Sequence, residues 1–387
     1  MPISSRAFRP EAVRALFNPR ARRSPSPAAH GVLDARAIRE AALGIRSWPG
    51  YAPTPLVRLE ELADELGLGE LLYKDESSRF GLGSFKALGG AYAVRRLVET
   101  FGAGLTVATA TDGNHGRAVA WAARRFDCRC VVFVHERVSE GRKRAIAAFG
   151  AEVRVVPGSY DDAVRACAAE AAARGWWLVS DTAWPGQEDV PRRVLEGYAL
   201  VAEEAAHALD APPTHVFVQA GVGAFAAAIA WTFASIYGER RPRLAVVEPE
   251  RAACCLASCA AGRRVAIGGD LSTVMAGLAC GEPSSLAWPI LDELADVFLT
   301  VPDEAAIAAM RLLARGMRGD PPIVAGESGV AGLAAVVALA HHPELRSRLD
   351  LGPHSRVLVF GTEGATDPEL YARLVGATSS ADAEEQP

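Results

Sequence analysis

One lysine of this 387-residue chain stands where a charged side chain is costly. Lys86 lies in the apolar, glycine-rich segment 84–90, Ser-Phe-Lys-Ala-Leu-Gly-Gly. Burying a lysine is unfavourable unless its amine is neutralised or used chemically. Desolvation lowers the pKa of a lysine and frees an amine that can form a Schiff base. We therefore expect Lys86 to hold a carbonyl compound.

A second chemical segment follows an apolar run at 105–111. It reads Asp-Gly-Asn-His-Gly over residues 112–116 and leads into a helical pattern. The N–H groups at a helix N-terminus attract anions, and a carboxylate is one such anion. The two segments together predict a carbonyl cofactor, held by Lys86 and contacted by Asn114, next to a site for a carboxylate substrate.

Alternating strand and helix patterns must position these residues. Short apolar, β-branched runs predict strands at 71–74, 105–110, 128–134, 152–156, 177–179, 215–219, 244–247 and 357–360. Between them, helical patterns cover 117–126, 142–149, 160–174 and 191–209. Such alternation predicts parallel sheets with helices on both faces, and ligands beyond the carboxyl ends of the strands. Three motifs follow a strand directly, at 112–116, 221–225 and 362–367, so we expect them to meet in one crevice.

Composition excludes several classes of protein. Half of the residues are hydrophobic, 22% are charged and the net charge is −5, which disfavours nucleic-acid binding. No apolar run approaches the roughly 18 residues of a membrane span. The seven cysteines lack paired spacing, so we expect no metal site, no disulfide framework and a cytoplasmic location. We expect a flexible segment at 1–30 and a disordered tail at 378–387.

Residues 221–226, Gly-Val-Gly-Ala-Phe-Ala, also admit a different function. A glycine turn after a strand, followed by an acid such as Glu248 after the next strand, is typical of dinucleotide sites. This alternative predicts a nicotinamide-dependent oxidoreductase. However, it explains neither Lys86 nor the 112–116 segment, and the same turn can bind a single phosphate monoester.

The chain resembles the fold-type II pyridoxal-phosphate enzymes, and within them the diaminopropionate ammonia-lyases. The resemblance runs from Pro49 to Tyr371 and is most specific at 111–117 (Thr-Asp-Gly-Asn-His-Gly-Arg) and 275–283 (Met-Ala-Gly-Leu-Ala-Cys-Gly-Glu-Pro). It is also carried by the blocks at 49–56, 74–77, 79–82, 85–90, 181–184, 219–223, 247–249, 326–329 and 362–367. It implies two three-layer α/β/α domains with open, twisted, mostly parallel sheets. The large pyridoxal-phosphate-binding domain would comprise 31–88 plus 208–377, and the small domain 89–207.

The resemblance also implies roles for individual residues. Lys86 would hold the cofactor and later act as a base, and Asp112 would be the second acid/base on the opposite face of the substrate. Asp181 would contact the amino group of the substrate or orient its neighbours. Other cofactor-binding positions are Phe85, Asn114, Gly221, Val222, Gly223, Ala224 and Thr362. Substrate contacts are expected from Thr111, Asp112, Gly113, His115 and Asp181.

The implied reaction is α,β-elimination of ammonia from D- or L-2,3-diaminopropionate, giving pyruvate and two ammonia, in a homodimer. Ser84 and Ala365 depart from the family pattern, and they favour a serine/threonine dehydratase or a β-replacement enzyme as the alternative. Simple roles also stay open for two acids, because Asp112 could cap the following helix and Asp181 could stabilise a turn.

Overall fold

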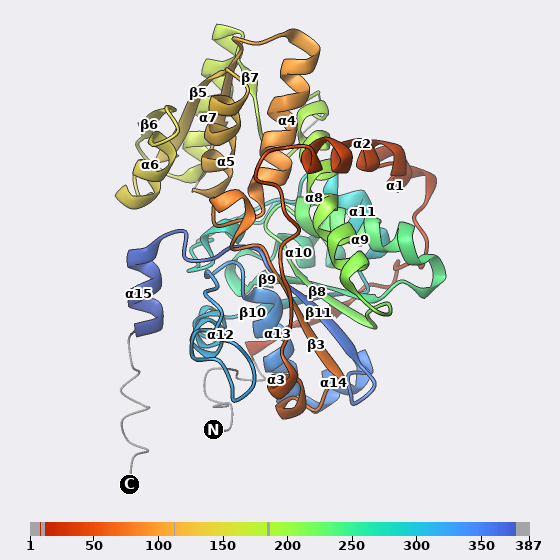
Figure 1. Ribbon diagram of the computed structural model, residues 1–387. Helices are drawn as coiled ribbons and strands as arrows, with labels where there is room; N and C mark the ends of the chain where they lie inside the picture. Colours follow the sequence, from red (N-terminus) through yellow and green to blue (C-terminus); the bar gives the residue numbers. More distant parts are fainter. Residues whose placement is uncertain (1–7, 9–11, 112, 184–185, 377–387) are drawn as a thin grey trace.

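The structure is a computed structural model that describes residues 8, 12–111, 113–183 and 186–376. Within these residues the chain forms two sheets, the smaller above the larger in Figure 1. The larger sheet has the strand order β1-β10-β9-β8-β11-β3-β2, and the smaller has the order β6-β5-β4-β7. The larger sheet contains β1 (Ala15–Phe17), β2 (Leu56–Arg58), β3 (Glu70–Asp75), β8 (His215–Gln219), β9 (Arg243–Pro249), β10 (Val297–Val301) and β11 (Arg356–Gly361). The smaller contains β4 (Thr106–Ala110), β5 (Arg129–His135), β6 (Glu152–Val156) and β7 (Trp177–Leu178).

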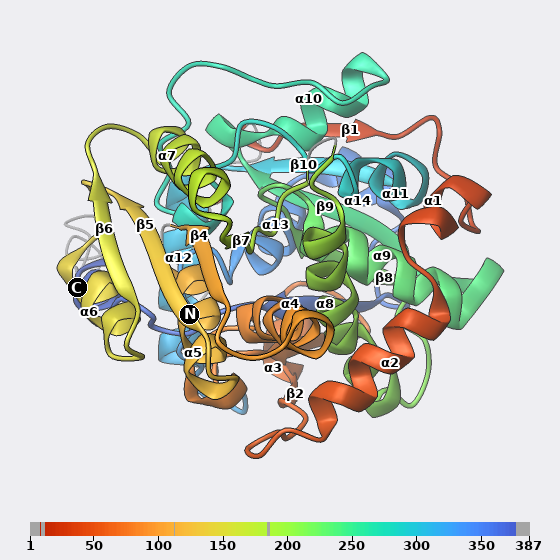
Figure 2. The same ribbon diagram turned by 90° about the horizontal axis from the view of Figure 1, so that it is seen from above.

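Helices cover both faces of these sheets, as the alternation of patterns predicts. They are α1 (Pro27–Val32), α2 (Ala35–Arg46), α3 (Glu60–Glu65), α4 (Lys86–Phe101), α5 (Asn114–Arg125), α6 (Glu140–Ala147), α7 (Tyr160–Arg174), α8 (Asp189–Ala208), α9 (Ala224–Tyr237), α10 (Cys254–Ala261), α11 (Ala287–Leu294), α12 (Asp303–Arg315), α13 (Ala331–Ala340), α14 (Pro343–Leu349) and α15 (Pro368–Gly376). Figure 2 shows α4 and α8 side by side, with α4 toward the smaller sheet and α9 on the other side of α8.

Parallel pairing dominates both sheets. All pairs of the smaller sheet are parallel, and only the two edge strands of the larger sheet, β1 and β2, pair antiparallel. Successive side chains of a strand point to opposite faces. Accordingly Val216 and Val218 of β8 join the core beneath α8 and α9, whereas Phe217 joins the core beneath α12 and α13. Both faces are therefore buried, which explains the continuous apolar runs in the sequence.

All eight predicted strands are present within a residue or two, but three further strands were not predicted. β1 and β2 have only three residues each, too few to show a pattern. β1 also lies inside the segment expected to be flexible, and that expectation is corrected: residues 15–17 pair with β10. The expected tail at 378–387 lies outside the described residues, and the two domain boundaries stay a prediction. No helix among the described residues is long and apolar enough to cross a membrane.

Two interior glycines let α4 and α8 cross closely. A Cβ atom on Gly197 of α8 would lie 2.1 Å from the carbonyl oxygen of Leu88. A Cβ atom on Gly89 of α4 would lie 2.5 Å from Cε1 of Tyr198. Neither distance is sterically possible, so no larger residue fits while the helices keep this separation. The crossing fixes the start of α4, where Lys86 stands, against α8.

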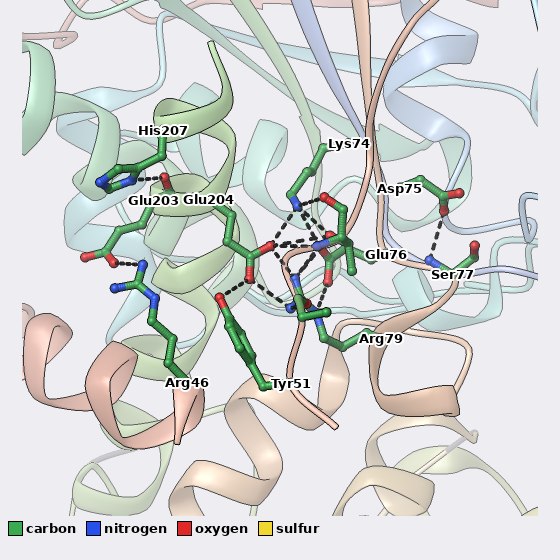
Figure 3. Close-up of polar contacts among 12 residues, drawn as sticks. Arg46, Tyr51, Lys74, Asp75, Glu76, Ser77, Arg79, Glu203, Glu204 and His207 are labelled. Atoms are coloured by element: carbon green, nitrogen blue, oxygen red, sulfur yellow. Dashed lines mark hydrogen bonds and ion pairs between the residues drawn. The ribbon is translucent and has the colours of Figure 1, made fainter. Parts of the chain in front are cut away.

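A buried cluster of four charged side chains ties α8 to the segment that leads to Lys86 (Figure 3). We call Lys74, Glu76, Arg79 and Glu204 the charge quartet. The Arg79 guanidinium donates to Glu76 Oε1 at 2.8 Å and to Glu204 Oε2 at 2.7 Å, and Lys74 Nζ donates to Glu204 at 2.7 Å. Two positive and two negative charges thus cancel in a site that is almost fully buried.

Candidate active site

Most of the predicted site residues line one cavity between the two sheets. They are Phe85, Lys86, Thr111, Gly113, Asn114, His115, Asp181, Gly221, Val222, Gly223, Ala224 and Thr362. They come from the N-terminus of α4 and from the segments after β4, β7, β8 and β11. The expected meeting of the three post-strand motifs is therefore confirmed. Asp112 lies outside the described residues.

Lys86 is the first residue of α4, and its amine forms an ion pair with Asp181. Nζ of Lys86 donates to Oδ2 of Asp181 at 2.6 Å, across two elements 95 residues apart. Burial lowers the pKa of Lys86, but attraction to the Asp181 carboxylate outweighs it, so the net shift is upward. Burial likewise raises the pKa of Asp181, and the Lys86 ammonium reverses this to a net decrease. The expected lowering of the Lys86 pKa is thus wrong for this arrangement, because the sequence did not reveal the partner.

His115 lines the cavity and is held in one tautomer. Its Nε2 lies 3.0 Å from the carbonyl oxygen of Val179, and because a carbonyl only accepts, Nε2 must carry the hydrogen. Burial lowers the pKa of His115, which keeps the ring neutral. Its Nδ1 is therefore a buried lone pair, and it has no hydrogen-bond partner among the described residues.

The 221–223 loop forms a cradle in front of α9. Gly223 has a φ of +85°, and a Cβ atom there would lie 2.8 Å from Cδ1 of Leu291. A Cβ atom on Gly221 would lie 3.0 Å from Sγ of Cys280. Both glycines are therefore needed sterically. The first N–H groups of α9 have no intrahelical acceptor and sit at the positive end of the helix dipole, an arrangement that suits a phosphate.

Glu363 and Gln219 are site residues that the sequence reasoning missed. The Asn114 amide donates to the Glu363 carboxylate, which also accepts the N–H of Ser328 at 2.9 Å. Nε2 of Gln219 donates to the Thr362 hydroxyl at 2.9 Å. Gln219 ends β8, and Glu363 follows β11 after one residue, so their positions at strand ends were the available signal.

An ion pair also joins α6, which packs on the smaller sheet, to the part of the chain that contains the larger sheet. Nη2 of Arg142 donates to Oε1 of Glu327 at 2.7 Å, and the Ser139 hydroxyl donates to Asp367 at 2.8 Å. Burial and the nearby Glu363 charge raise the pKa of Glu327 to about 7, although Arg142 opposes the shift. Arg142 lines the cavity, so this contact lies at its edge.

Glu248 is not available for the dinucleotide alternative. Its carboxylate accepts the N–H groups of Cys255 at 2.7 Å and Leu256 at 2.8 Å, and so caps α10. The side chain is fully buried, and burial raises its pKa to about 7. The acid that this alternative requires for a ribose is thus engaged within the protein.

Comparison with known proteins identifies the family. The model of the pyridoxal-phosphate dependent enzymes matches residues 47–363. The diaminopropionate ammonia-lyase of Escherichia coli K12 is 41% identical over 349 residues, which cover 84% of this chain and 88% of that protein. The chain belongs to the pyridoxal-phosphate enzyme family that includes the diaminopropionate ammonia-lyases.

Two further comparisons agree with this membership. The diaminopropionate ammonia-lyase of Salmonella typhimurium is 38% identical and covers 94% of this chain and 98% of its own length. The crystal structure of the Escherichia coli enzyme with an aminoacrylate–pyridoxal-phosphate azomethine intermediate superimposes with a TM-score of 0.88. That pair is 37% identical, with 94% of this chain and 96% of the other covered. The expected fold-type II architecture is confirmed.

The cavity of this family member fits pyridoxal phosphate. Lys86 supplies the amine for the aldehyde, and the glycine cradle with the α9 N-terminus suits the phosphate. The lone pair of His115 Nδ1 is a buried acceptor that lacks a partner, as expected where a ligand completes the site.

Proposed function

We propose that this chain is a carbon–nitrogen lyase that uses pyridoxal phosphate to eliminate ammonia from 2,3-diaminopropionate. The products are pyruvate and two ammonia. The observation that carries the proposal is the Lys86 amine, paired with Asp181 inside a cavity whose glycine cradle suits a phosphate. The relatives at 41% and 38% identity carry the name of this activity, which favours it over the dehydratase and β-replacement alternatives.

The bound cofactor stabilises the negative charge left at the α-carbon when its proton departs. Lys86 would hold the cofactor covalently and, once displaced by substrate, would take the α-proton. The N–H groups of Gly221, Val222, Gly223 and Ala224 would bind the phosphate. Asn114, whose amide donates to Glu363, would contact the phenolic oxygen. Thr362 would offer the pyridine nitrogen a hydroxyl, which would leave that nitrogen largely unprotonated, and Phe85 would pack beside the cofactor.

Asp181 has a second role in this scheme. When Lys86 is engaged by the cofactor, the Asp181 carboxylate loses its partner and can accept the ammonium of the substrate instead. Its lowered pKa keeps it anionic for that purpose. The Thr111 hydroxyl accepts the N–H groups of Gly113 at 2.9 Å and Gly116 at 3.1 Å, so it shapes the turn that holds His115 beside the substrate.

The proposal also includes an oligomeric state, a cellular location and a division into domains. The enzyme works as a homodimer in the cytoplasm. All seven cysteines are among the described residues and none is in a disulfide, which suits a reducing compartment. The chain divides into a large domain at 31–88 plus 208–377 and a small domain at 89–207.

The deciding experiment is an absorption spectrum of the purified protein before and after each enantiomer of 2,3-diaminopropionate, with pyruvate assayed in the same cuvette. We expect a cofactor band that shifts on addition, with pyruvate formed. A shift without pyruvate would reject this substrate and favour the dehydratase or β-replacement alternative. No band after incubation with pyridoxal phosphate would reject the cofactor. The Lys86→Ala variant, which cannot bond the cofactor, is the control.

Two bases on opposite faces would let both enantiomers react, with Lys86 serving the L form and Asp112 the D form. We predict that Asp112→Asn lowers kcat for the D substrate by about a hundred-fold or more, because a positioned base contributes on that order. The L substrate should lose much less. Steady-state kinetics on both enantiomers test this, and equal losses would reject the two-base scheme.

A further inference from the structure

Tyr198 places a hydroxyl in the cavity that the protein itself does not use. Its side chain is fully buried on α8 and lines the cavity beside Lys86. The hydroxyl makes no hydrogen bond of normal geometry to a described residue, although the Lys86 amine lies near enough to lower the pKa of the phenol. A buried polar group without a partner destabilises a protein, and such groups in native structures require an explanation.

The position of the Tyr198 ring is fixed from several sides. The ring packs 4.7 Å from that of Phe85 and 6.0 Å from that of Phe225, measured between centroids. Gly89 leaves the space for its edge, because a Cβ atom there would lie 2.5 Å from Cε1 of Tyr198. The close crossing of α4 and α8 thus holds the phenol in place, and its hydroxyl cannot leave the cavity without disturbing that crossing.

Lys86 is a charged group close to this phenol. Nζ of Lys86 lies 5.7 Å from the centroid of the Tyr198 ring and 2.6 Å from the Asp181 carboxylate. Burial raises the pKa of Tyr198, which keeps the phenol neutral, while the Lys86 ammonium pulls that pKa downward. The amine therefore has one carboxylate and one neutral hydroxyl within its surroundings.

We propose that Tyr198 is a positioning residue whose hydroxyl accepts a hydrogen bond from Lys86 Nζ when that amine carries the substrate's α-proton. This inference rests on the proposed function, and it adds a residue to it. When the α C–H bond breaks, the proton moves to Nζ and the electron pair stays at the α-carbon. The new ammonium has three N–H donors. Asp181 accepts one and Tyr198 accepts another, so the amine is steered while its charge develops.

The first test compares Tyr198→Phe with Tyr73→Phe. Tyr73 is equally buried and its hydroxyl also lacks a partner, but it does not line the cavity. We expect Tyr198→Phe to lower kcat for the L substrate about ten-fold with little change in KM, since a hydrogen bond to a charged group is lost. The D substrate, served by Asp112, should be much less affected. Tyr73→Phe should change neither.

Thermal unfolding separates positioning from a structural role. The Tyr198 hydroxyl makes no hydrogen bond of normal geometry to a described residue in the cofactor-free protein, so Tyr198→Phe should change the Tm of that form little. A Tm lower by several degrees, or equal losses of kcat for both enantiomers, would overturn the proposal.

A second readout does not depend on the substrate. Lys86 must be neutral to bond the aldehyde, so the rate of pyridoxal-phosphate uptake by the cofactor-free protein reports the pKa of Lys86. Besides Tyr198, the groups that face Lys86 are Asp181, Cys280 and His115, and the variant leaves all three in place. A neutral phenol raises the Lys86 pKa by accepting from the ammonium, so if Tyr198 does this, its replacement by Phe should move the uptake profile to lower pH. If the wild-type protein makes no pyruvate, the proposed function is rejected, and the uptake profile alone tests the role of Tyr198. An unshifted profile would overturn that role.

Discussion

At the scale of single residues, the chemistry of the site depends on the protonation states of Lys86 and His115, which their neighbours determine. Lys86 is paired with Asp181 and so is held as an ammonium in the cofactor-free protein, whereas His115 is held neutral by burial and by the Val179 carbonyl. A charged lysine and a neutral imidazole thus share one cavity. In the cofactor-free protein, Lys86 supplies the positive charge beside Asp181. A substrate ammonium can take that place, and His115 need not supply a proton.

We predict that His115 is neutral at pH 7 and above, with its hydrogen on Nε2. The physical reason is that burial lowers its pKa and the Val179 carbonyl can only accept. Nitrogen-15 NMR of the histidine rings measures both the charge and the tautomer, and the His115→Gln variant assigns the signal. An imidazolium signal at pH 7, or a hydrogen on Nδ1, would contradict the prediction.

At the scale of elements, the charge quartet connects β3, the 76–79 segment and α8. Glu204 and Arg79 are 125 residues apart, and burial of a charged group is tolerable only with its partners in place. Burial raises the pKa of Glu204, but Arg79 and Lys74 lower it to about 2, so it stays ionised down to strongly acidic pH.

We predict that Arg79→Gln destabilises the protein by roughly 3–5 kcal/mol, because it leaves two buried carboxylates with only Lys74 to balance them. The matched control is Arg36→Gln, which breaks an exposed pair with Glu40 and should cost less than about 1 kcal/mol. Urea unfolding of the cofactor-free variants measures both changes. Similar costs for the two substitutions would mean that the quartet contributes no more than a surface pair.

The elements were far more predictable than these contacts. Strands such as 152–156 and 215–219 were predicted with their observed bounds, because apolar β-branched runs bounded by turns are a local signal. β10 has the same kind of run, Val-Phe-Leu-Thr-Val, and could have been predicted. Lys86 and the 221–223 glycine loop could likewise be recognised from the residues next to them in the sequence. The pairing of Lys86 with Asp181 and the placement of Tyr198 depend on helix and loop packing, which the sequence does not display.

At the scale of the whole molecule, the cavity is a joint product of the two sheets. Arg142 and Ser139 at the start of α6 bind Glu327 and Asp367 of the larger unit, so the edge of the cavity is closed by contacts between them. Glu327 gives this closure a dependence on pH. Its pKa is raised in the folded protein, so the folded state binds a proton more tightly than the unfolded chain does.

We predict that stability decreases as pH rises from about 4.5, the ordinary carboxyl value, to about 7, the raised value of Glu327. The sign follows from the raised pKa: the contribution is complete below the unfolded value and is lost as pH passes the folded one. Glu327→Gln cannot titrate and should reduce the slope of this part of the profile, while Glu248, whose pKa is also raised to about 7, keeps the rest of it. Tm measured against pH for both proteins tests this, and parallel profiles would contradict it.

The close crossing of α4 and α8 also limits how this enzyme can be altered by mutation. Gly89 and Gly197 admit no side chain at the present helix separation; Gly197 directly precedes Tyr198, and Gly89 follows Lys86 by three residues, and both Tyr198 and Lys86 line the cavity. If every amino acid is placed in turn at each of these two positions, we therefore expect few functional variants at either one. Variants with a changed substrate range should come instead from residues such as Tyr160 and Cys280, which line the cavity but do not set the helix separation.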